Sequence, residues 1–231
     1  MDKKKIELVM SVVLILAAIL VSARGTIFTG SSSAKAKERV IVIDAGHGGT
    51  DPGKIGINKA KEKDINLIIA KKLKKLLEKE GIRVVMVRED DNGLYRQESE
   101  SKKVEDMRNR CTLIDEAEPI CTISVHQNSY HEEEIKGAQV FYYEHSKDGK
   151  EIAEYLQQSL VDGLDRSNRR QAKANDSYYL LRKTKNPTII VECGFLSNWE
   201  EAELLVTDKY QKKVAKAICA GIMKYLEDTK Q

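Results

Sequence analysis

The chain has 231 residues, of which 41% are hydrophobic and 32% are charged, and its formal net charge is +3. This composition is typical of a globular domain with a hydrophobic core. Basic and acidic residues are interspersed, whereas nucleic-acid binding usually requires a concentrated basic face, so composition and charge argue against a nucleic-acid partner.

The N-terminal segment differs from the rest of the chain. Lys3, Lys4 and Lys5 precede an apolar stretch of fourteen residues, 8–21. A spanning helix needs about 20 residues, and small residues follow at Ser22 and Ala23. We therefore expect residues 1–23 to be a secretory signal peptide or an N-terminal membrane anchor. Both alternatives predict an exported domain whose contact with the membrane is limited to this segment. Residues 24–37 are rich in Ser, Gly, Ala and Lys and are predicted to be a linker.

Strand and helix patterns alternate from residue 38 to residue 231. Short apolar, β-branched runs predict strands at 40–43, 84–87, 120–126, 138–143, 178–181 and 188–191. Apolar residues at helical spacing predict helices at 65–77, 104–116, 152–164, 200–205 and 210–227, and the first of these has Asp64 as its cap. The alternation predicts a single α/β domain with a mostly parallel or mixed central sheet and helices on both faces.

Three predicted strands lead to residues that can bind a metal or carry a proton. The first precedes the loop Gly46-His47-Gly48-Gly49, the third ends at His126, and the strand at 188–191 leads to Glu192. Ligands of such sheets bind beyond the carboxyl ends of the strands. We therefore expect His47, His126 and Glu192 to form one site.

Two histidines and a carboxylate are a common ligand set for catalytic zinc, which leaves one position open. The carboxylates near the His47 loop are Asp44, Asp51, Glu62 and Asp64, and spacing alone does not choose among them. Glu192 suits a second role, transferring a proton between water and a leaving amine. The glycine loop could instead bind a dinucleotide, but it lacks the third glycine of G-x-G-x-x-G and no helix follows it directly.

The cysteines and one basic loop can be explained without a catalytic role. The four cysteines, Cys111, Cys121, Cys193 and Cys219, are expected to be small buried thiols, because their spacing favours no disulfide. A basic loop at 165–176 contains Arg166, Arg169, Arg170 and Lys173, and is either solvated or faces an acidic substrate.

Four ordered motifs resemble one known family. They are Asp44–Gly49, Glu62–Leu67, Ser124–Asn128 and Val191–Asn198. In this combination they resemble the zinc-dependent N-acetylmuramoyl-L-alanine amidases of the amidase-3 family, from about residue 40 to residue 226. The resemblance implies that His47, Glu62 and His126 hold Zn²⁺, that Glu192 is the catalytic carboxylate, and that residues 38–231 are the catalytic domain. The substrate would be the amide between N-acetylmuramic acid and L-alanine in peptidoglycan.

Further segments, 103–108, 137–141 and 178–181, resemble the CwlD-type amidases of spore-forming bacteria. That resemblance implies action in the spore cortex, where removal of stem peptides allows muramic-δ-lactam to form, and germination as the process served. It also implies functional partnership with a peptidoglycan deacetylase and, as in some clostridial members, an accessory lipoprotein that activates the enzyme.

Two alternative functions use the same residues. A zinc peptidase cutting within the stem peptide would differ only in its substrate groove. A non-catalytic peptidoglycan-binding module could keep the fold, although retention of all three ligands and Glu192 argues against it.

Overall fold

A computed structural model of the chain describes residue 10 and residues 38–229. The chain divides into two units, residues 1–37 and residues 38–231. The predicted signal peptide or anchor and the linker therefore lie, except for Met10, outside the described residues. Among the helices of the described part, none has the length and apolar character needed to cross a membrane.

One mixed sheet of six strands forms the centre of the described domain, in the order β2-β1-β3-β6-β4-β5. Neighbouring strands run parallel except β4 and β6, which are antiparallel. The bounds are β1 (Val40–Ala45), β2 (Arg83–Met86), β3 (Cys121–Asn128), β4 (Gln139–Tyr143), β5 (Lys173–Asn175) and β6 (Thr188–Phe195).

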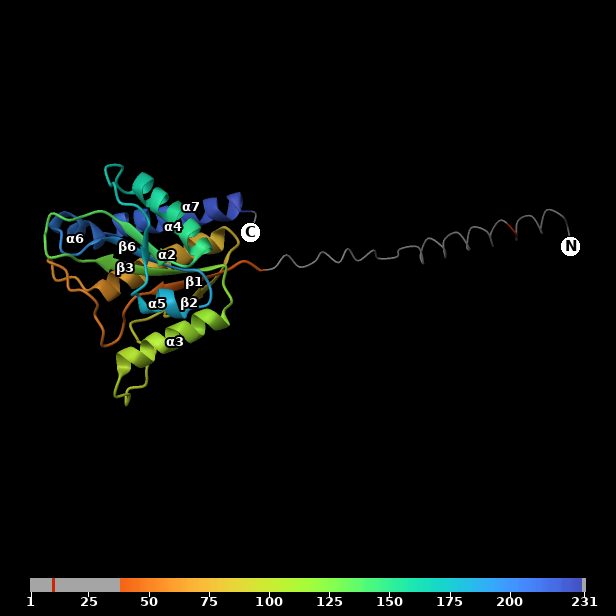
Figure 1. Cartoon of the computed structure of the whole chain (residues 1–231), viewed down its shortest axis with the longest axis horizontal. Coiled ribbons are helices and arrows are strands. Elements are labelled where there is room, and N and C mark those ends of the chain that lie inside the picture. Colours follow the sequence, from red (N-terminus) through yellow and green to blue (C-terminus); the bar gives the residue numbers. More distant parts are fainter. Residues whose placement is uncertain (1–9, 11–37, 230–231) are drawn as a thin grey trace. The chain divides into compact units, whose positions relative to one another are not determined.

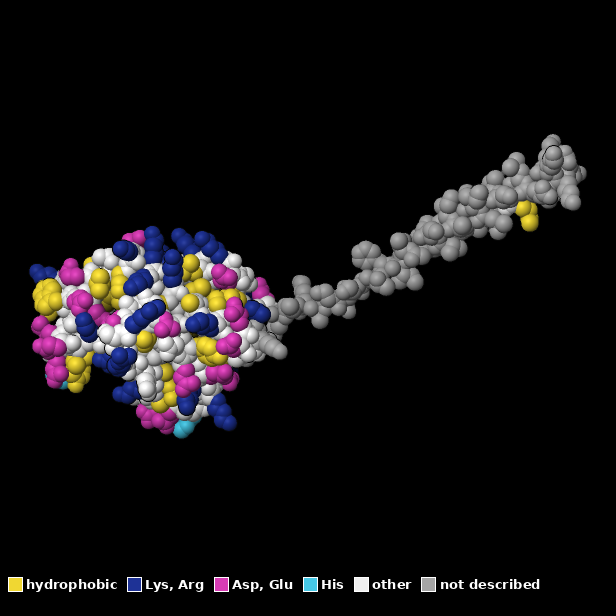
Figure 2. Space-filling model, turned by 90° about the horizontal axis from the view of Figure 1, so that it is seen from above, with side chains coloured by type: hydrophobic (Ala, Val, Ile, Leu, Met, Phe, Trp, Pro, Cys, Tyr) yellow, Lys and Arg dark blue, Asp and Glu magenta, His cyan; other side chains and the backbone are white. Residues whose placement is uncertain are grey.

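Helices cover both faces of this sheet, which confirms the predicted α/β architecture (Figure 1). The larger core joins one face to α2 (Glu62–Lys79), α4 (Lys147–Gly163), α6 (Trp199–Leu205) and α7 (Asp208–Asp228). A smaller core on the other face packs under α3 (Lys102–Glu116) and α5 (Tyr179–Lys183). Over the domain face seen in Figure 2, basic and acidic side chains are interspersed.

Side-chain alternation in β1 explains why both faces are covered. Ile41 and Ile43 pack into the larger core, whereas Val42 belongs to the smaller one. Successive side chains of a strand point to opposite faces of the sheet, so an all-apolar strand needs helices on both sides. In α2, Ile69 and Leu73 present the apolar face that covers the larger core.

Two sequence predictions about the elements are wrong. The run 178–181, predicted as a strand, is mostly the short helix α5, and the strand in that region is β5, inside the predicted loop. The side chain of Asn175 accepts hydrogen bonds from the backbone N–H groups of Ser177 and Tyr178, which turns the chain after β5. A short apolar run has no periodicity that separates strand from helix.

The second error concerns the start of α2. This helix begins at Glu62, two residues before the predicted cap, and its N-cap residue is Lys61, with no side-chain capping bond. Asp64 therefore lies in the first turn, where a carboxylate interacts favourably with the helix dipole. The earlier start matters for function, because it fixes Glu62 on a helix instead of leaving it in a loop.

Candidate metal and catalytic site

The loop after β1 holds His47 in an unusual backbone conformation. His47 has a φ of 63°, in the left-handed region that non-glycine residues seldom adopt. The Arg110 guanidinium donates a hydrogen bond of 2.6 Å to the backbone carbonyl of His47. On the imidazole itself, Nδ1 lies 2.9 Å from the Asp51 carboxylate, and Nε2 faces the carboxylate of Glu62. Two protein contacts thus fix both the backbone and the ring of His47.

Glu62 reaches the site from the first turn of α2 and is 2% exposed. Its Oε2 accepts a hydrogen bond of 2.8 Å from the backbone N–H of Lys54, and its Oε1 accepts one of 3.0 Å from the backbone N–H of Gln127. A carboxylate held by backbone donors on two sides has little freedom to rotate. Hence the helix start and the neighbouring strand together set its direction.

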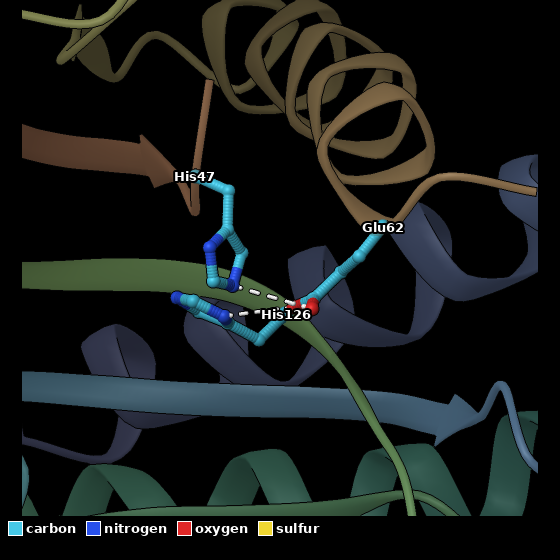
Figure 3. A group of neighbouring side chains, drawn as sticks. All are labelled: His47, Glu62 and His126. Atoms are coloured by element: carbon cyan, nitrogen blue, oxygen red, sulfur yellow. Dashed lines mark hydrogen bonds and ion pairs between the residues drawn. The ribbon is translucent and has the colours of Figure 1, made fainter. Parts of the chain in front are cut away.

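The structure brings His47, Glu62 and His126 together, although sequence separates them by up to 79 positions (Figure 3). His47 Nε2 lies 3.2 Å from Glu62 Oε2, and His126 Nδ1 lies 3.0 Å from Glu62 Oε1. One nitrogen from each imidazole and one carboxylate oxygen all lie within 4.8 Å of one another. Two imidazoles and a carboxylate converging in this way fit a zinc ion, because these donors suit that metal and three protein ligands leave a position open.

Charge within the cluster also favours a cation. Burial raises the pKa of Glu62, but hydrogen bonds and charges from the two histidines outweigh it and hold this pKa far below its usual range. Burial lowers the pKa of His126, yet the hydrogen bond and charge of Glu62, assisted by Glu192 and Asp44, raise it to about 9. A second proton-binding group, His47, has a raised pKa for the same reason. Glu62 is therefore ionised, and its negative charge favours a bound cation or protonated histidines next to it.

Glu192 lies beside this cluster on β6, directly opposite His126 in the strand register. The prediction that both residues stand at strand ends is only approximate, because β3 and β6 continue past them to Asn128 and Phe195. Glu192 is 7% exposed, and its Oε2 is buried without a hydrogen-bond partner among the described residues. Burial is the main reason that its pKa is raised to about 7. An unpaired buried carboxylate with this pKa can both accept and donate a proton near neutrality.

A buried network that the sequence reasoning missed supports the His47 loop. Arg110 and Asp44 form an ion pair of 2.5 Å, and both side chains are 2% exposed. Ser124 donates a hydrogen bond of 2.6 Å to the other oxygen of Asp44. A second arginine, Arg88, donates to the backbone carbonyls of Ala45, Gly46 and Lys63. The only sequence signal for these roles was their position near predicted strands and helices, which is shared by many other charged residues.

The cluster opens into a cavity of about 470 Å³. One side carries the loop after β1 together with His126 and Glu192, and the facing side carries the first turns of α3 and the start of α5. Aromatic and basic side chains line these outer parts: Tyr95, Lys102, Lys103, Tyr178 and Tyr179. A substrate in this cavity would therefore meet the candidate metal site and a cationic, aromatic wall together.

Other residues singled out in the sequence lie elsewhere. The basic loop does not line the cavity: the Arg170 guanidinium instead donates to the backbone carbonyl of Lys136 and to the Gln139 side chain. The four cysteines are free and buried, as predicted. Burial also raises the pKa of Cys193, which makes it a poor nucleophile despite its position beside Glu192.

Comparison with known proteins adds four findings. The family model described as N-acetylmuramoyl-L-alanine amidase matches residues 41–224. A germination-specific N-acetylmuramoyl-L-alanine amidase of Bacillus subtilis is 37% identical over 193 residues, which cover 82% of this chain and 81% of that protein. The structure of the CwlD amidase from Clostridioides difficile, solved in complex with the GerS lipoprotein, is 40% identical with a TM-score of 0.80, and the match covers 83% of this chain and all of that one. Another amidase structure, from Clostridium difficile 630, is 30% identical with a TM-score of 0.72, covering 82% of this chain and 97% of the other.

Proposed function

The chain belongs to the N-acetylmuramoyl-L-alanine amidase family, and we propose that it is a zinc-dependent enzyme that hydrolyses the amide between N-acetylmuramic acid and L-alanine in peptidoglycan. The observation that carries this proposal is the convergence of two imidazoles and a carboxylate beside the unpaired oxygen of Glu192, inside a cavity open to a substrate.

His47, Glu62 and His126 would hold the zinc ion. Zinc bound there would supply a Lewis acid that polarises the carbonyl of the scissile amide. The contribution of the chain is to fix the three donors before the metal arrives. Asp51 orients His47, and the backbone N–H groups of Lys54 and Gln127 orient Glu62. Such outer contacts set ring orientation and ligand direction, which metal affinity depends on.

Glu192 would carry the proton in this reaction. Its buried carboxylate takes a proton from the attacking water and returns it to the amine of L-alanine as the amide bond breaks. The net change is the addition of one water across one amide, which leaves a carboxylate on the lactyl group and a free peptide amine. Burial raises the pKa of this carboxylate, which makes it a better proton acceptor and so suits it to take up the proton and then pass it on.

The relatives also support a proposal for the biological setting. The similarity to a germination-specific amidase and to CwlD supports export to the cell wall and action in the spore cortex, where loss of stem peptides would permit muramic-δ-lactam formation. The structure of a CwlD amidase was solved in complex with the GerS lipoprotein, which supports an accessory lipoprotein as a partner here. A peptidoglycan deacetylase would act on the product glycan to complete the lactam. An N-terminal signal or anchor in residues 1–23 would deliver residues 38–231, the catalytic domain, outside the membrane.

The decisive experiment compares residues 24–231 with the variant Glu192→Gln on purified peptidoglycan with zinc, and analyses the released fragments by mass spectrometry. We expect the unmodified protein to release stem peptides that begin with L-alanine. Loss of the proton carrier should reduce this turnover at least about 100-fold. Glu203→Gln removes one exposed carboxylate and serves as the matched control.

Zinc content and circular dichroism of each variant show whether the fold and the metal are retained. Fragments cut within the stem peptide would favour the peptidase alternative. Equal turnover by Glu192→Gln with full zinc content would refute the role given to Glu192. No release by the folded, zinc-bearing protein, with or without an accessory lipoprotein, would favour a binding module.

A further inference from the structure

The charged groups that line the cavity are almost all paired within the protein. Arg110 forms ion pairs of 2.5 Å with both Asp44 and Asp106. The carboxylate of Asp51 lies 2.9 Å from the His47 ring. The exception is Glu192, which is buried with no hydrogen-bond partner for its Oε2 among the described residues, and this carboxylate is already assigned to proton transfer. These groups are therefore committed to the architecture of the site, and substrate recognition by charge must come from another residue.

Two lysines at the start of α3 line the cavity, and they differ in their contacts. The ammonium of Lys102 lies 5.5 Å from the centroid of the Tyr95 ring and 3.5 Å from the Gln97 side chain. For Lys103, by contrast, no hydrogen bond or ion pair occurs within residues 38–229. The side chain of Lys103 is exposed at the cavity wall. It is thus the lining cation whose charge is available to a ligand.

Lys103 also lines the same cavity as the candidate metal site. His47, His126 and Glu192 line this cavity. The carboxylate of Asp51, which lies 2.9 Å from the His47 ring, lines it as well. A substrate group bound by Lys103 would lie close to an amide placed at the candidate metal site.

We propose that Lys103 is a specificity residue that binds a free carboxylate of the stem peptide, close to the cleaved amide. This inference rests on the proposed amidase function. The second residue of a stem peptide is commonly a γ-linked D-glutamate, whose α-carboxylate stays free, and in some walls this carboxylate is amidated to D-isoglutamine. A lysine ammonium is a compact charge on a flexible chain, so it can attract the carboxylate but gains little from the neutral amide. The cavity wall that carries Lys103 is then the side along which the peptide runs.

The test uses two synthetic muramyl tripeptides that differ only in this group, one with D-glutamate and one with D-isoglutamine. The zinc-loaded protein, its variant Lys103→Gln and the control Arg108→Gln are compared on both by kcat/KM. Arg108 is an exposed cation on the same helix that does not line the cavity, so it reports the effect of net charge alone. We expect Lys103→Gln to lower kcat/KM about fivefold on the D-glutamate substrate. On the D-isoglutamine substrate, Lys103→Gln should change kcat/KM by less than about twofold. The control Arg108→Gln should leave kcat/KM unchanged on both substrates.

An equal loss on both substrates, or no loss on either, would overturn the role of Lys103 while leaving the amidase function intact. If the zinc-loaded protein cleaves neither substrate, even with an accessory lipoprotein, the proposed function fails and this inference fails with it. A second readout does not depend on turnover. The product tripeptide with D-glutamate should inhibit the unmodified protein more strongly than Lys103→Gln, with a difference that shrinks at high salt.

Discussion

Zinc binding to the metal-free protein should release a proton from His126, and the affinity should therefore increase with pH. Burial lowers the pKa of His126, but Glu62, whose Oε1 lies 3.0 Å from Nδ1, raises it to about 9. A metal binds the neutral imidazole, so the proton must leave before the bond can form. The negative charge of Glu62 thus has two effects: it attracts the zinc ion, and it holds a proton on His126 with which the zinc ion must compete.

The size of the effect follows from this pKa. At pH 7, about 99% of His126 would be protonated if its pKa is about 9. Each zinc ion bound at pH 7 should displace about one proton from His126, with a further fraction from His47, whose pKa is also raised. The apparent association constant should rise about tenfold per pH unit from pH 7 and level off near pH 9. An ordinary histidine with a pKa of about 6.5 would give an almost flat profile over this range.

The same shift predicts how the metal-free fold responds to pH. A histidine whose pKa is raised in the folded state contributes stability that is fully present below about pH 6.5 and is lost as pH rises through about 9. Addition of zinc should reverse this trend, because the neutral imidazole is then the bound form. Thermal unfolding with and without zinc would show the two slopes.

Calorimetry in buffers of different ionisation enthalpy counts the released protons at pH 7, 8 and 9. A proton NMR titration of the metal-free protein gives the pKa of His126 directly. In the control Glu62→Gln the main charge that raises this pKa is absent, whereas burial and the smaller effects of Glu192 and Asp44 remain, so the pKa should fall well below 9. Zinc binding without proton release, together with a flat affinity from pH 7 to pH 9, would refute the reasoning.

Two further changes test the parts that support the site. Arg110→Met should destabilise the fold by about 3–5 kcal/mol, because it leaves the buried carboxylate of Asp44 unpaired, and the midpoint of urea unfolding measures this loss. Gly46→Ala should weaken zinc binding at least about tenfold in a folded protein, since the added Cβ would lie 2.3 Å from the ring of His126, and competition with a chelator measures the affinity.

Each change has a matched control. Arg108→Met removes an exposed cation from the same helix and should alter stability by less than about 0.5 kcal/mol. Gly81→Ala adds a Cβ at a glycine with a φ of 76° but with nothing within 4 Å, so it should affect stability and leave zinc affinity unchanged. Stability of Arg110→Met equal to that of Arg108→Met, or full zinc affinity in Gly46→Ala, would contradict the packing described here.

The sheet could be predicted from the sequence because its strands are apolar on both faces, and this pattern can be recognised without knowing any contact. Val42 in strand 40–43 is one such buried residue. The helix at 65–77 could be predicted in the same way from its apolar spacing, which includes the buried Ile69. The error at 178–181 has the opposite cause. Four residues contain too little periodicity to decide, and the side chain of Asn175, which turns the chain, lies outside the run.

The candidate site was predicted in part for a similar reason. His47 follows a recognisable strand, and His126 and Glu192 lie near the carboxyl ends of two others; because these strands are parallel, they bring the three residues to one edge of the sheet. Glu62 was one of four acidic alternatives, and only the family resemblance selected it. Its place depends on where α2 begins and on backbone donors from Lys54 and Gln127, and neither leaves a local mark in the sequence.

Parallel strands that end at one edge of the sheet are not sufficient to form this site, because His47 also needs the buried network of Arg110 and Asp44. The left-handed backbone of His47 is strained for a non-glycine residue, at a cost on the order of 1–3 kcal/mol. The Arg110 guanidinium stabilises it with a bond to the His47 carbonyl, and Arg110 is itself fixed by Asp44 at the end of β1. The same helix, α3, carries both Arg110 and Lys103, and both residues line the cavity. The helix therefore connects the position of the metal ligand His47 to the cavity wall that would hold the peptide. A change that shifts α3 should consequently alter zinc affinity and substrate selectivity together, whereas a change confined to the Lys103 side chain should alter selectivity alone.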